Sequence, residues 1–456
     1  MSSNPASLTQ YVDFTITIDM PDRMEVKYID QGQVYITNGH LSSDPTRLLN
    51  IERLHRWVKL CLGDQQDVAL GRRSNFQIEV QDLKVIGLNL YQLLFSDEGI
   101  RKKFRAAYDQ FQKDPKRGNR RMRLQLQFHR DAQDLSNLPW EFLYIPEQHD
   151  RNLMQGFFFS GQRKELILTR LVPQSRYMAS GSMAENLRIL VAMSTPSDAG
   201  PVDTTDLRIF FEQLEASPIK PTVQYLDEEH CTTDRFTETL QTFKPHIVHF
   251  VGHGKEGQLG FIKKSSDDDY DETKGGLQTR WVPADQLQVL ITNSDWVPRL
   301  IFLHACKGAV ASSNEAFNSC ARELVYGDVP VVVAMQHSIS NLDAAKFART
   351  FYKSLGEGSD VDLAVREGRT ALGNAYPVWE HPRFGTPVVY LQTGRPIVQC
   401  APTLSDTTTG ETQEAGSLSS ASRIASVRAS GVAQRVSDPA SAAPASRAHD
   451  ADPLSG

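Results

Sequence analysis

The chain has 456 residues and a formal net charge of −6, with 49 lysine and arginine residues against 55 aspartate and glutamate residues. This length allows two or three domains with a large core, and the near-balance of charge provides no global attraction for nucleic acid or for an anionic membrane. The 5 cysteines form no C-x-x-C pair, no apolar run is long enough to span a membrane, and the first residues lack a signal-peptide pattern. We therefore expect a cytoplasmic protein that contacts neither nucleic acid nor membrane directly.

The first third of the chain mixes strand and helix patterns. Segments enriched in β-branched and aromatic residues predict strands at 13–19, 34–38 and 76–80. Apolar residues at helical spacing predict helices at 44–63 and 97–112. We therefore expect a mixed α+β region in the N-terminal part of the chain.

The end of this region carries further signals. RMRLQLQF (121–128) alternates as a half-buried strand does, and LPWEFLYIP (138–146) is apolar and aromatic enough to be buried. The stretch 173–186, rich in Ser, Met and Gly, is typical of a linker. It predicts a domain boundary after residues 1–172.

From residue 187 onward, strands and helices alternate. The predicted strands are rich in Val, Ile and Leu: LRILVAM (187–193), TVQYL (222–226), HIVHFV (246–251), RLIFLHA (299–305) and PVVVAM (330–335). Amphipathic helices separate them, which is typical of a parallel α/β sheet covered on both faces, with function at the carboxyl ends of the strands. The last part of the chain, 396–456, becomes dominated by Ser, Ala, Thr and Pro, and we expect it to be a disordered tail.

A glycine-rich segment, HFVGHGKEG (249–257), contains the pattern G-x-G-x-x-G. A dinucleotide site needs such glycines to open a helix, whereas the residues after Gly257 lack helical periodicity and include an acidic run. A metal site from His246, His249 and His253 is also disfavoured, because strand residues alternate between faces and no acidic or cysteine ligand adjoins them. We expect structural roles for His246 and His249, and neither a metal nor an organic cofactor.

The strand ends point to a cysteine nucleophile. His253 comes just past the strand at 246–251, and Cys306 comes directly after the strand at 299–305. If these strands are parallel neighbours, the imidazole lies beside the thiol and can activate it, and the backbone amides of Gly254 and Cys306 can form an oxyanion hole. A cysteine at a strand end is also commonly a small buried apolar residue, so the residues alone leave both interpretations open.

The segments IVHFVGHG and LIFLHACKGA resemble the two signature blocks of the CHAT peptidases, a family of caspase-like cysteine proteases. The similarity runs on to WEHPRFGTPVVYL and back through LPWEFLYI, over roughly residues 80–392. The resemblance implies a caspase-like α/β fold, with a mostly parallel β-sheet flanked by helices in a peptidase domain at 187–395, preceded by the α+β region. It also implies that proteins are the substrates, that Cys306 is the nucleophile and His253 the general base and acid, and that the amides of Gly254 and Cys306 bind the oxyanion.

The resemblance also indicates where specificity is decided. In relatives the residue two before the nucleophile often lines the first specificity pocket, which makes His304 a candidate. The loop after the next strand borders the substrate cleft in this clan, so Gln336 and His337 are further candidates.

An acidic run follows the histidine block and includes Asp267, Asp268 and Asp269. Facing the cleft, these carboxylates would favour basic substrates; otherwise they belong to a solvated surface loop. The sequence therefore leans weakly towards cleavage after a basic residue.

Regulation is expected to come from outside the chain, because no sensor domain is recognisable in it. We expect an upstream protease or a regulatory partner to switch the enzyme on, by cutting the loop at 263–276 or through a tail that bears Arg423, Arg428, Arg435 and Arg447. Relatives act in bacterial antiviral defence, including proteolytic cascades linked to type III CRISPR systems, so the resemblance implies a similar role. The alternative function, from a class other than enzymes, is a catalytically silent interaction module. The presence of both a histidine and a cysteine at the strand ends argues against it.

Overall fold

The structure is a computed structural model, and most of the chain up to residue 392 can be described. The described residues are 10–19, 22–30, 33–62, 78–115, 118, 120–147, 155–173, 187–200, 202, 204–216, 220–255, 257–267, 269–273, 275–305, 314–337, 339–375 and 378–392. The predicted tail, the predicted linker after residue 173, Cys306 and Asp268 lie outside them. Of the described helices, none is long and apolar enough to cross a membrane.

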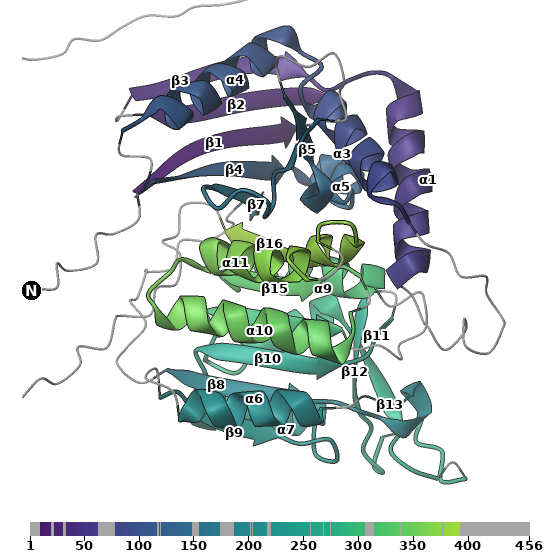
Figure 1. Ribbon diagram of the computed structural model, residues 1–456. Helices are drawn as coiled ribbons and strands as arrows, with labels where there is room; N and C mark the ends of the chain where they lie inside the picture. Colours follow the sequence, from purple (N-terminus) through teal and green to yellow (C-terminus); the bar gives the residue numbers. More distant parts are fainter. Residues whose placement is uncertain are drawn as a thin grey trace, which may run out of the picture. The chain divides into compact units, whose positions relative to one another are not determined.

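One large, mostly parallel sheet runs through the described residues (Figure 1). It has 11 strands in the order β3-β2-β1-β4-β7-β16-β15-β14-β10-β8-β9. In chain order these strands are β1 (Gln10–Asp19), β2 (Arg23–Asp30), β3 (Gln33–His40), β4 (Arg120–Phe128), β7 (Leu166–Val172), β8 (Arg188–Met193), β9 (Thr222–Leu226), β10 (Ile247–Gly252), β14 (Leu300–Ala305), β15 (Val331–Met335) and β16 (Pro387–Gln392). The pairs β1/β2, β2/β3 and β15/β16 are antiparallel, and the other neighbours are parallel.

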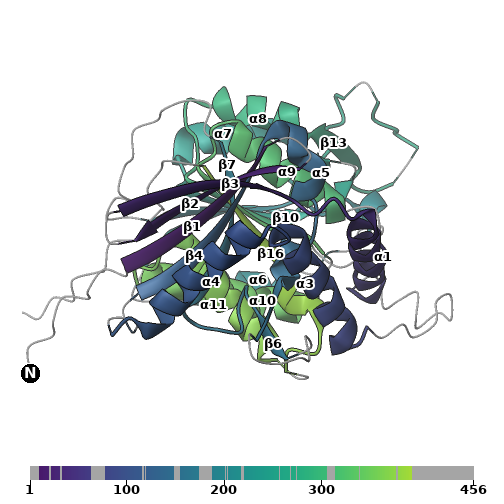
Figure 2. The ribbon, with the colours of Figure 1, turned by 90° about the horizontal axis from the view of Figure 1, so that it is seen from above.

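Helices cover both faces of this sheet. They are α1 (Pro45–Leu62), α3 (Val80–Leu94), α4 (Glu98–Lys113), α5 (Gln133–Ser136), α6 (Thr205–Glu215), α7 (Thr233–Phe243), α8 (Ala284–Thr292), α9 (Asn314–Tyr326), α10 (Asn341–Gly356) and α11 (Val361–Gly373). Around the central strands, α6, α10 and α11 lie on one face and α7, α8 and α9 on the other (Figure 2). This arrangement explains the continuous apolar runs of β10 and β15, whose residues are all buried. The predicted fold class, α/β with a mostly parallel sheet flanked by helices, is confirmed.

The predicted strand at 76–80 is wrong for residues 78–80, the part of it that the structure describes. Ile78 and Glu79 lie in no strand, and Val80 begins helix α3. The Asp82 carboxylate accepts a 3.0 Å hydrogen bond from the Glu79 backbone amide, which is half of a capping box. Downstream, Leu83, Ile86, Leu90 and Leu94 are buried at helical spacing. For this segment, the capping box and the helical spacing of apolar residues are therefore stronger signals than the short β-branched run.

The predicted N-terminal region and the predicted peptidase domain contribute strands to the same sheet. Strand β7 of the first part pairs in parallel with β16 of the second, with Arg170 opposite Tyr390. The boundary at 173–186 stays a prediction, since residues 174–186 lie outside the described residues. The strand at 121–128 is confirmed as β4, and the predicted burial of 138–146 is confirmed by Trp140 and Phe142, which are fully buried.

A smaller sheet adjoins the end of β10. It consists of β11 (Gly254–Lys255), β12 (Gln258–Ile262) and β13 (Thr279–Pro283), paired antiparallel. A strand, and not a helix, therefore follows Gly257. This geometry does not suit a dinucleotide, because no helix N-terminus is available for the pyrophosphate.

Candidate functional site

Two neighbouring strand ends form the core of the candidate site. Strands β10 and β14 pair in parallel, with Gly252 directly opposite Ala305. The predicted adjacency of the two strands is therefore confirmed. In the sequence, His253 follows Gly252 and Cys306 follows Ala305. Cys306 itself lies outside the described residues, so its side chain is not described.

Gly252 and the small sheet set the position of His253. A Cβ atom added to Gly252 would lie 2.7 Å from the Ser194 carbonyl oxygen, so only glycine fits this close approach to the end of β8. The chain then enters β11, and the Gly260 amide of β12 donates a 2.9 Å hydrogen bond to the His253 carbonyl. The close approach at Gly252 and this hydrogen bond together fix the position of the His253 backbone.

The imidazole of His253 is held by a backbone carbonyl. Its Nε2 atom lies 3.1 Å from the Gly200 oxygen, which can only accept, so Nε2 carries the proton and Nδ1 has a free lone pair. No described residue forms a hydrogen bond with Nδ1. Burial lowers the pKa of His253, whereas the Gly200 carbonyl and the Asp198 charge raise it in part. The ring is therefore neutral at pH 7 and ready to accept a proton at Nδ1.

Gly200 needs to be a glycine. Its backbone has φ 104° and ψ 164°, a region that other residues rarely adopt. Hydrogen bonds hold residues 194–200 against β13 and the residues just before it. The Ser197 amide donates to the Leu277 carbonyl at 2.8 Å, and the Asp198 carboxylate accepts from the amide and the hydroxyl of Thr279. The loop therefore presents the Gly200 carbonyl at a fixed position.

Gly200 and Asp198 are site residues that were not predicted from the sequence. The available signal was their place in the loop directly after β8, because ligands of parallel sheets bind at such strand ends. A backbone carbonyl leaves no signature in the choice of residue.

His304 belongs to a buried chain of polar contacts. Its Nδ1 atom lies 3.3 Å from Nε2 of His249, and Nδ1 of His249 lies 3.0 Å from the Tyr352 hydroxyl. Burial lowers the pKa of His304 to about 4 and that of His249 well below its ordinary value. His246 is separate: its Nδ1 accepts a 3.1 Å hydrogen bond from the Arg188 amide. The predicted structural roles of His246 and His249 are confirmed, and no three His, Cys, Asp or Glu side chains in the described part of the chain are placed to hold a metal ion.

Gln336 and His337, the predicted pocket residues after β15, are both buried. Gln336 is buried, and its amide donates to Glu141 at 2.7 Å and to the Gly385 carbonyl. His337 is fully buried between Phe142 and His55, at ring distances of 6.2 and 5.1 Å, and burial lowers its pKa to about 3. Both side chains join the end of β15 to the N-terminal part of the chain, and their place beside a substrate cleft stays a prediction.

The acidic run is paired with cations of its own segment. Asp267 lies 3.4 Å from Arg280, and Asp269 lies 2.8 Å from Lys263. Asp268 lies outside the described residues. Exposed ion pairs of this kind contribute little energy, so the lean towards basic substrates and the surface-loop interpretation both stay predictions.

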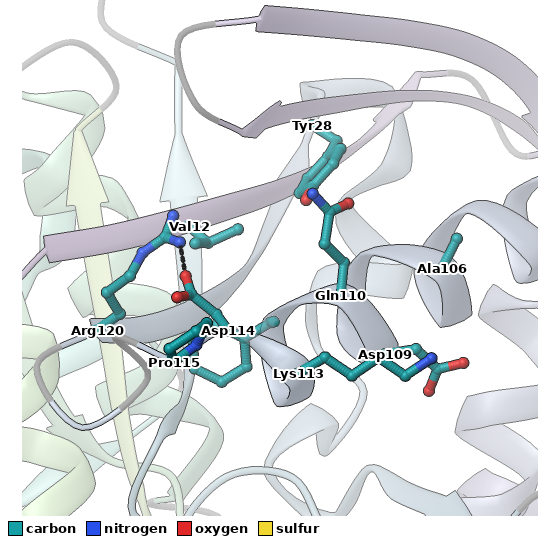
Figure 3. A pocket seen from close by; sticks show the side chains of 10 residues that line it. Val12, Tyr28, Ala106, Asp109, Gln110, Lys113, Asp114, Pro115 and Arg120 are labelled. Atoms are coloured by element: carbon teal, nitrogen blue, oxygen red, sulfur yellow. Dashed lines mark hydrogen bonds and ion pairs between the residues drawn. The ribbon is translucent and has the colours of Figure 1, made fainter.

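A cavity of about 560 Å³ lies elsewhere, between β1, β2 and the C-terminal half of α4 (Figure 3). Val12, Tyr28 and Gln110 line it, and an ion pair between Asp114 and Arg120 borders it. The cavity shares no residue with the ends of β10 and β14. We therefore assign it no part in the candidate site.

A comparison with models of known protein families identifies one family. The model of the CHAT domain family matches residues 85–384, well over half of the chain. Two crystal structures of the Saccharomyces cerevisiae separase–securin complex are similar: one at 3.0 Å resolution with a TM-score of 0.47 and 12% identity, and one at 2.6 Å with a TM-score of 0.43 and 11% identity. The alignments cover 84% and 83% of this chain but only 30% of the other chain in each case. No curated protein matches the sequence.

Proposed function

The chain belongs to the CHAT domain family of caspase-like, protease-type domains, and from this premise we propose that it is a cysteine endopeptidase in which Cys306 and His253 form the catalytic dyad. The observation that carries the proposal is the pairing of Gly252 with Ala305 on neighbouring parallel strands, because His253 and Cys306 are the next residues along the chain. The proposal is further supported by the imidazole of His253, whose Nε2 contacts the Gly200 carbonyl and whose Nδ1 forms no hydrogen bond with any described residue.

The chemistry follows from the state of His253. Nδ1 takes the proton of the Cys306 thiol, and the thiolate sulfur attacks the carbonyl carbon of the scissile peptide bond. The backbone amides of Gly254 and Cys306 are the proposed donors to the oxyanion. Nδ1 then returns the proton to the leaving amine as the C–N bond breaks, which leaves an acyl thioester. Water, deprotonated by Nδ1, attacks the thioester, and the thiol and the new carboxyl group are released. Throughout, the Gly200 carbonyl keeps the second proton on Nε2 and stabilises the imidazolium.

The burial of His253 supports a regulated enzyme. His253 is only 1% exposed as a residue, and in this proposal neighbouring chain segments move before a polypeptide substrate reaches Nδ1. We propose that an upstream protease or regulatory partner triggers this movement, with cleavage in 263–276 or in the tail as the two candidate events. Mass spectrometry of active enzyme would show such a cut, whereas full activity of an intact chain would exclude obligatory processing.

A thiol-directed acyl probe tests the dyad directly. We expect wild type, after exposure to its activator or to limited proteolysis, to be labelled at Cys306 and to cleave a peptide library, and Cys306→Ala and His253→Ala to do neither. Cys231→Ala is the matched control, because Cys231 is fully buried and burial raises its thiol pKa. Labelling of Cys231 in place of Cys306 contradicts the proposal. So does a wild type that is neither labelled nor active, an outcome that favours a silent interaction module.

The proposed partners are protein substrates, and the proposed setting is bacterial antiviral defence. Phage challenge of cells that carry the intact gene and its neighbours, compared with cells that carry Cys306→Ala, tests this setting. Equal phage survival in both would separate the protease from defence without affecting the proposed chemistry.

A further inference from the structure

Strand β3 forms one edge of the large sheet, where its backbone is open to a further strand (Figure 1). Just beyond β3, the Leu41 amide donates a 2.7 Å hydrogen bond to the Asp22 carbonyl. Because hydrogen-bonded pairs alternate along an antiparallel ladder, the register directs the amides and carbonyls of Val34, Ile36 and Asn38 away from β2. No described residue forms a hydrogen bond with these backbone groups. They therefore form a row of donors and acceptors with which an extended polypeptide segment can pair.

The side chains of this edge are apolar and exposed on the face opposite α4. On the α4 side, Lys103 lies 5.9 Å from the centre of the Tyr35 ring. Strand residues alternate between faces, so Val34 and Ile36 point away from α4, and they are 51% and 60% exposed. Ile29 of β2 pairs with Val34 and extends this apolar strip. Strand β3 contains no Lys, Arg, Asp, Glu or Pro, the residue types that commonly protect an edge strand from pairing.

The opposite edge of the sheet, formed by β9, has side-chain partners of its own. The Val223 amide of β9 donates a 3.3 Å hydrogen bond to the Glu215 carboxylate of α6. The Arg208 guanidinium, also on α6, lies 5.6 Å from the centre of the Tyr225 ring of β9. Side chains of α6 thus cover part of this edge, so β3 is the edge that is better suited to pairing.

We propose that β3 is a dimerisation strand, which pairs antiparallel with β3 of a second copy of this chain and joins the two sheets edge to edge. Such a contact requires a surface that is complementary to itself. In the proposed register, Val34 of one copy lies opposite Ile36 of the other, and both of these pairs exchange backbone hydrogen bonds. On the other face, the Tyr35 side chains of the two copies lie opposite each other. This dimer is independent of the proposed peptidase function, because β3 shares no residue with the candidate site.

The neighbouring strand β2 favours this register and this partner. A shift by two residues would place Val34 opposite the polar Asn38, whereas the proposed register matches apolar side chains in both directions. Beside β3, Ile29 pairs with Val34 and Lys27 pairs with Ile36, so an Ile and Val strip crosses the junction and ends at a lysine on each side. Three strand spacings, about 14 Å, separate the two lysines, which exceeds the screening length at physiological salt. No like charges therefore oppose the pairing of two copies.

The first test measures the mass of the full chain by sedimentation equilibrium, from about 1 to 100 μM. We expect the mass to rise from that of one chain to that of two. Ile36→Pro removes an amide that β2 does not use, so the dimer Kd should rise about 10- to 100-fold, and Ile36→Lys should leave only monomer. Leu49→Lys is the matched control, because Leu49 on α1 is 63% exposed; this variant should dimerise like wild type. A wild type that stays monomeric, or a dimer that survives both Ile36 variants, overturns the inference.

A second test examines the register through engineered disulfides. In the proposed pairing, the two Tyr35 residues form a non-hydrogen-bonded pair, whose closely spaced Cα atoms suit a disulfide. Tyr35→Cys should therefore give a disulfide-linked dimer on mild oxidation, with the linked peptide identified by mass spectrometry. Thr37→Cys is the control, because this position lies opposite Gln33 of the other copy. Equal linkage of the two variants, or none with Tyr35→Cys, overturns the proposed pairing.

Hydrogen exchange identifies what covers the edge. The amides of Val34 and Asn38 should exchange slowly in the wild-type dimer and quickly in the monomeric Ile36→Lys variant. Slow exchange in that monomer would show that a segment of the same chain covers β3, and it would overturn the second copy as the occupant. Masses above that of a dimer would show an open series of contacts between β3 and β9, and they would overturn the symmetric pairing.

Discussion

Gly200 positions the candidate general base through its backbone carbonyl, which makes a side-chain substitution at this glycine informative. With φ at 104°, Gly200→Ala forces the backbone to move or to remain strained by about 1–3 kcal/mol. The 3.1 Å contact with Nε2 of His253 is then lengthened or lost, and a displacement of this kind lowers kcat/KM by about 10- to 100-fold. Gly118→Ala is the control, because an added Cβ there meets nothing within 4 Å. Equal activity of the two variants would show that the carbonyl does not orient the ring.

The charge of Asp198 should influence how kcat/KM depends on pH. Burial lowers the pKa of His253 from its ordinary value of 6.5, and the Asp198 charge raises it in part. The proposed reaction needs neutral His253, so the acidic limb of kcat/KM should lie below pH 6.5. Asp198→Asn removes the charge that favours the imidazolium, and the limb should therefore move to still lower pH. The pH–rate profile of Asp198→Asn, measured against that of wild type, tests this prediction. An acidic limb that moves to higher pH would contradict the proposed effect of the Asp198 charge.

At the scale of single elements, Arg123 joins the N-terminal strands to α11. From β4 it reaches Asp360 at 2.5 Å and Asp362 at 2.8 Å, and its guanidinium lies 3.2 Å from the centre of the Tyr11 ring. Burial raises the pKa of Asp362, and Arg123 lowers it in part. The guanidinium therefore compensates two buried carboxylates at the start of the helix.

Removing this guanidinium should destabilise the protein strongly. Arg123→Leu leaves the carboxylates of Asp360 and Asp362 buried without their cation, and the free energy of unfolding should fall by about 3–5 kcal/mol in urea titrations. Arg23→Ala breaks an exposed pair with Asp19 and should cost less than about 1 kcal/mol. The double variant Arg123→Leu, Asp362→Leu should recover part of the loss. Comparable losses for Arg123→Leu and Arg23→Ala would show that the buried pairs add no stability.

Elements differ in how far the sequence predicts them. The sequence predicts β10 and β14 as neighbouring strands from their long apolar runs and from the rules of parallel sheets. The predicted positions of His253 and Cys306 depend on these two strands. Helix α3 was not predicted because the few β-branched residues around Ile78 favour a strand. The capping box and the apolar spacing that begin at Glu79 and Val80 indicate a helix only over a longer window. The contact between His253 and Gly200 joins residues 53 apart, and only the fold brings them together.

At the scale of the whole molecule, the sheet does not stop at the predicted domain boundary. Strand β7 pairs with β16, and a buried network crosses the same junction. Arg170 binds the Glu141 carboxylate and donates to the Tyr390 hydroxyl at 3.1 Å, while Arg369 donates to the Leu168 carbonyl at 3.2 Å. The network also reaches α9, the helix that follows the segment with Cys306, because the Tyr390 hydroxyl donates a hydrogen bond to the Asn318 side chain. Sequence patterns could mark the apolar segment at 138–146 as buried, but they carried no sign that its glutamate neutralises arginines far along the chain.

This continuity predicts that the segment from residue 187 onward does not fold alone. Without the N-terminal part, β16 becomes an open edge, and Arg369 and Gln336 lose the Glu141 carboxylate that each contacts in the buried network. Residues 187–456 expressed alone should therefore be insoluble or show no cooperative unfolding, whereas co-expression with residues 1–173 should restore a soluble complex. As a control, a protease site inserted in 174–186 of the intact chain should be cut without dissociating the halves, since the junction holds them together. A cooperatively unfolding, probe-reactive fragment 187–456 would instead establish an independent peptidase domain.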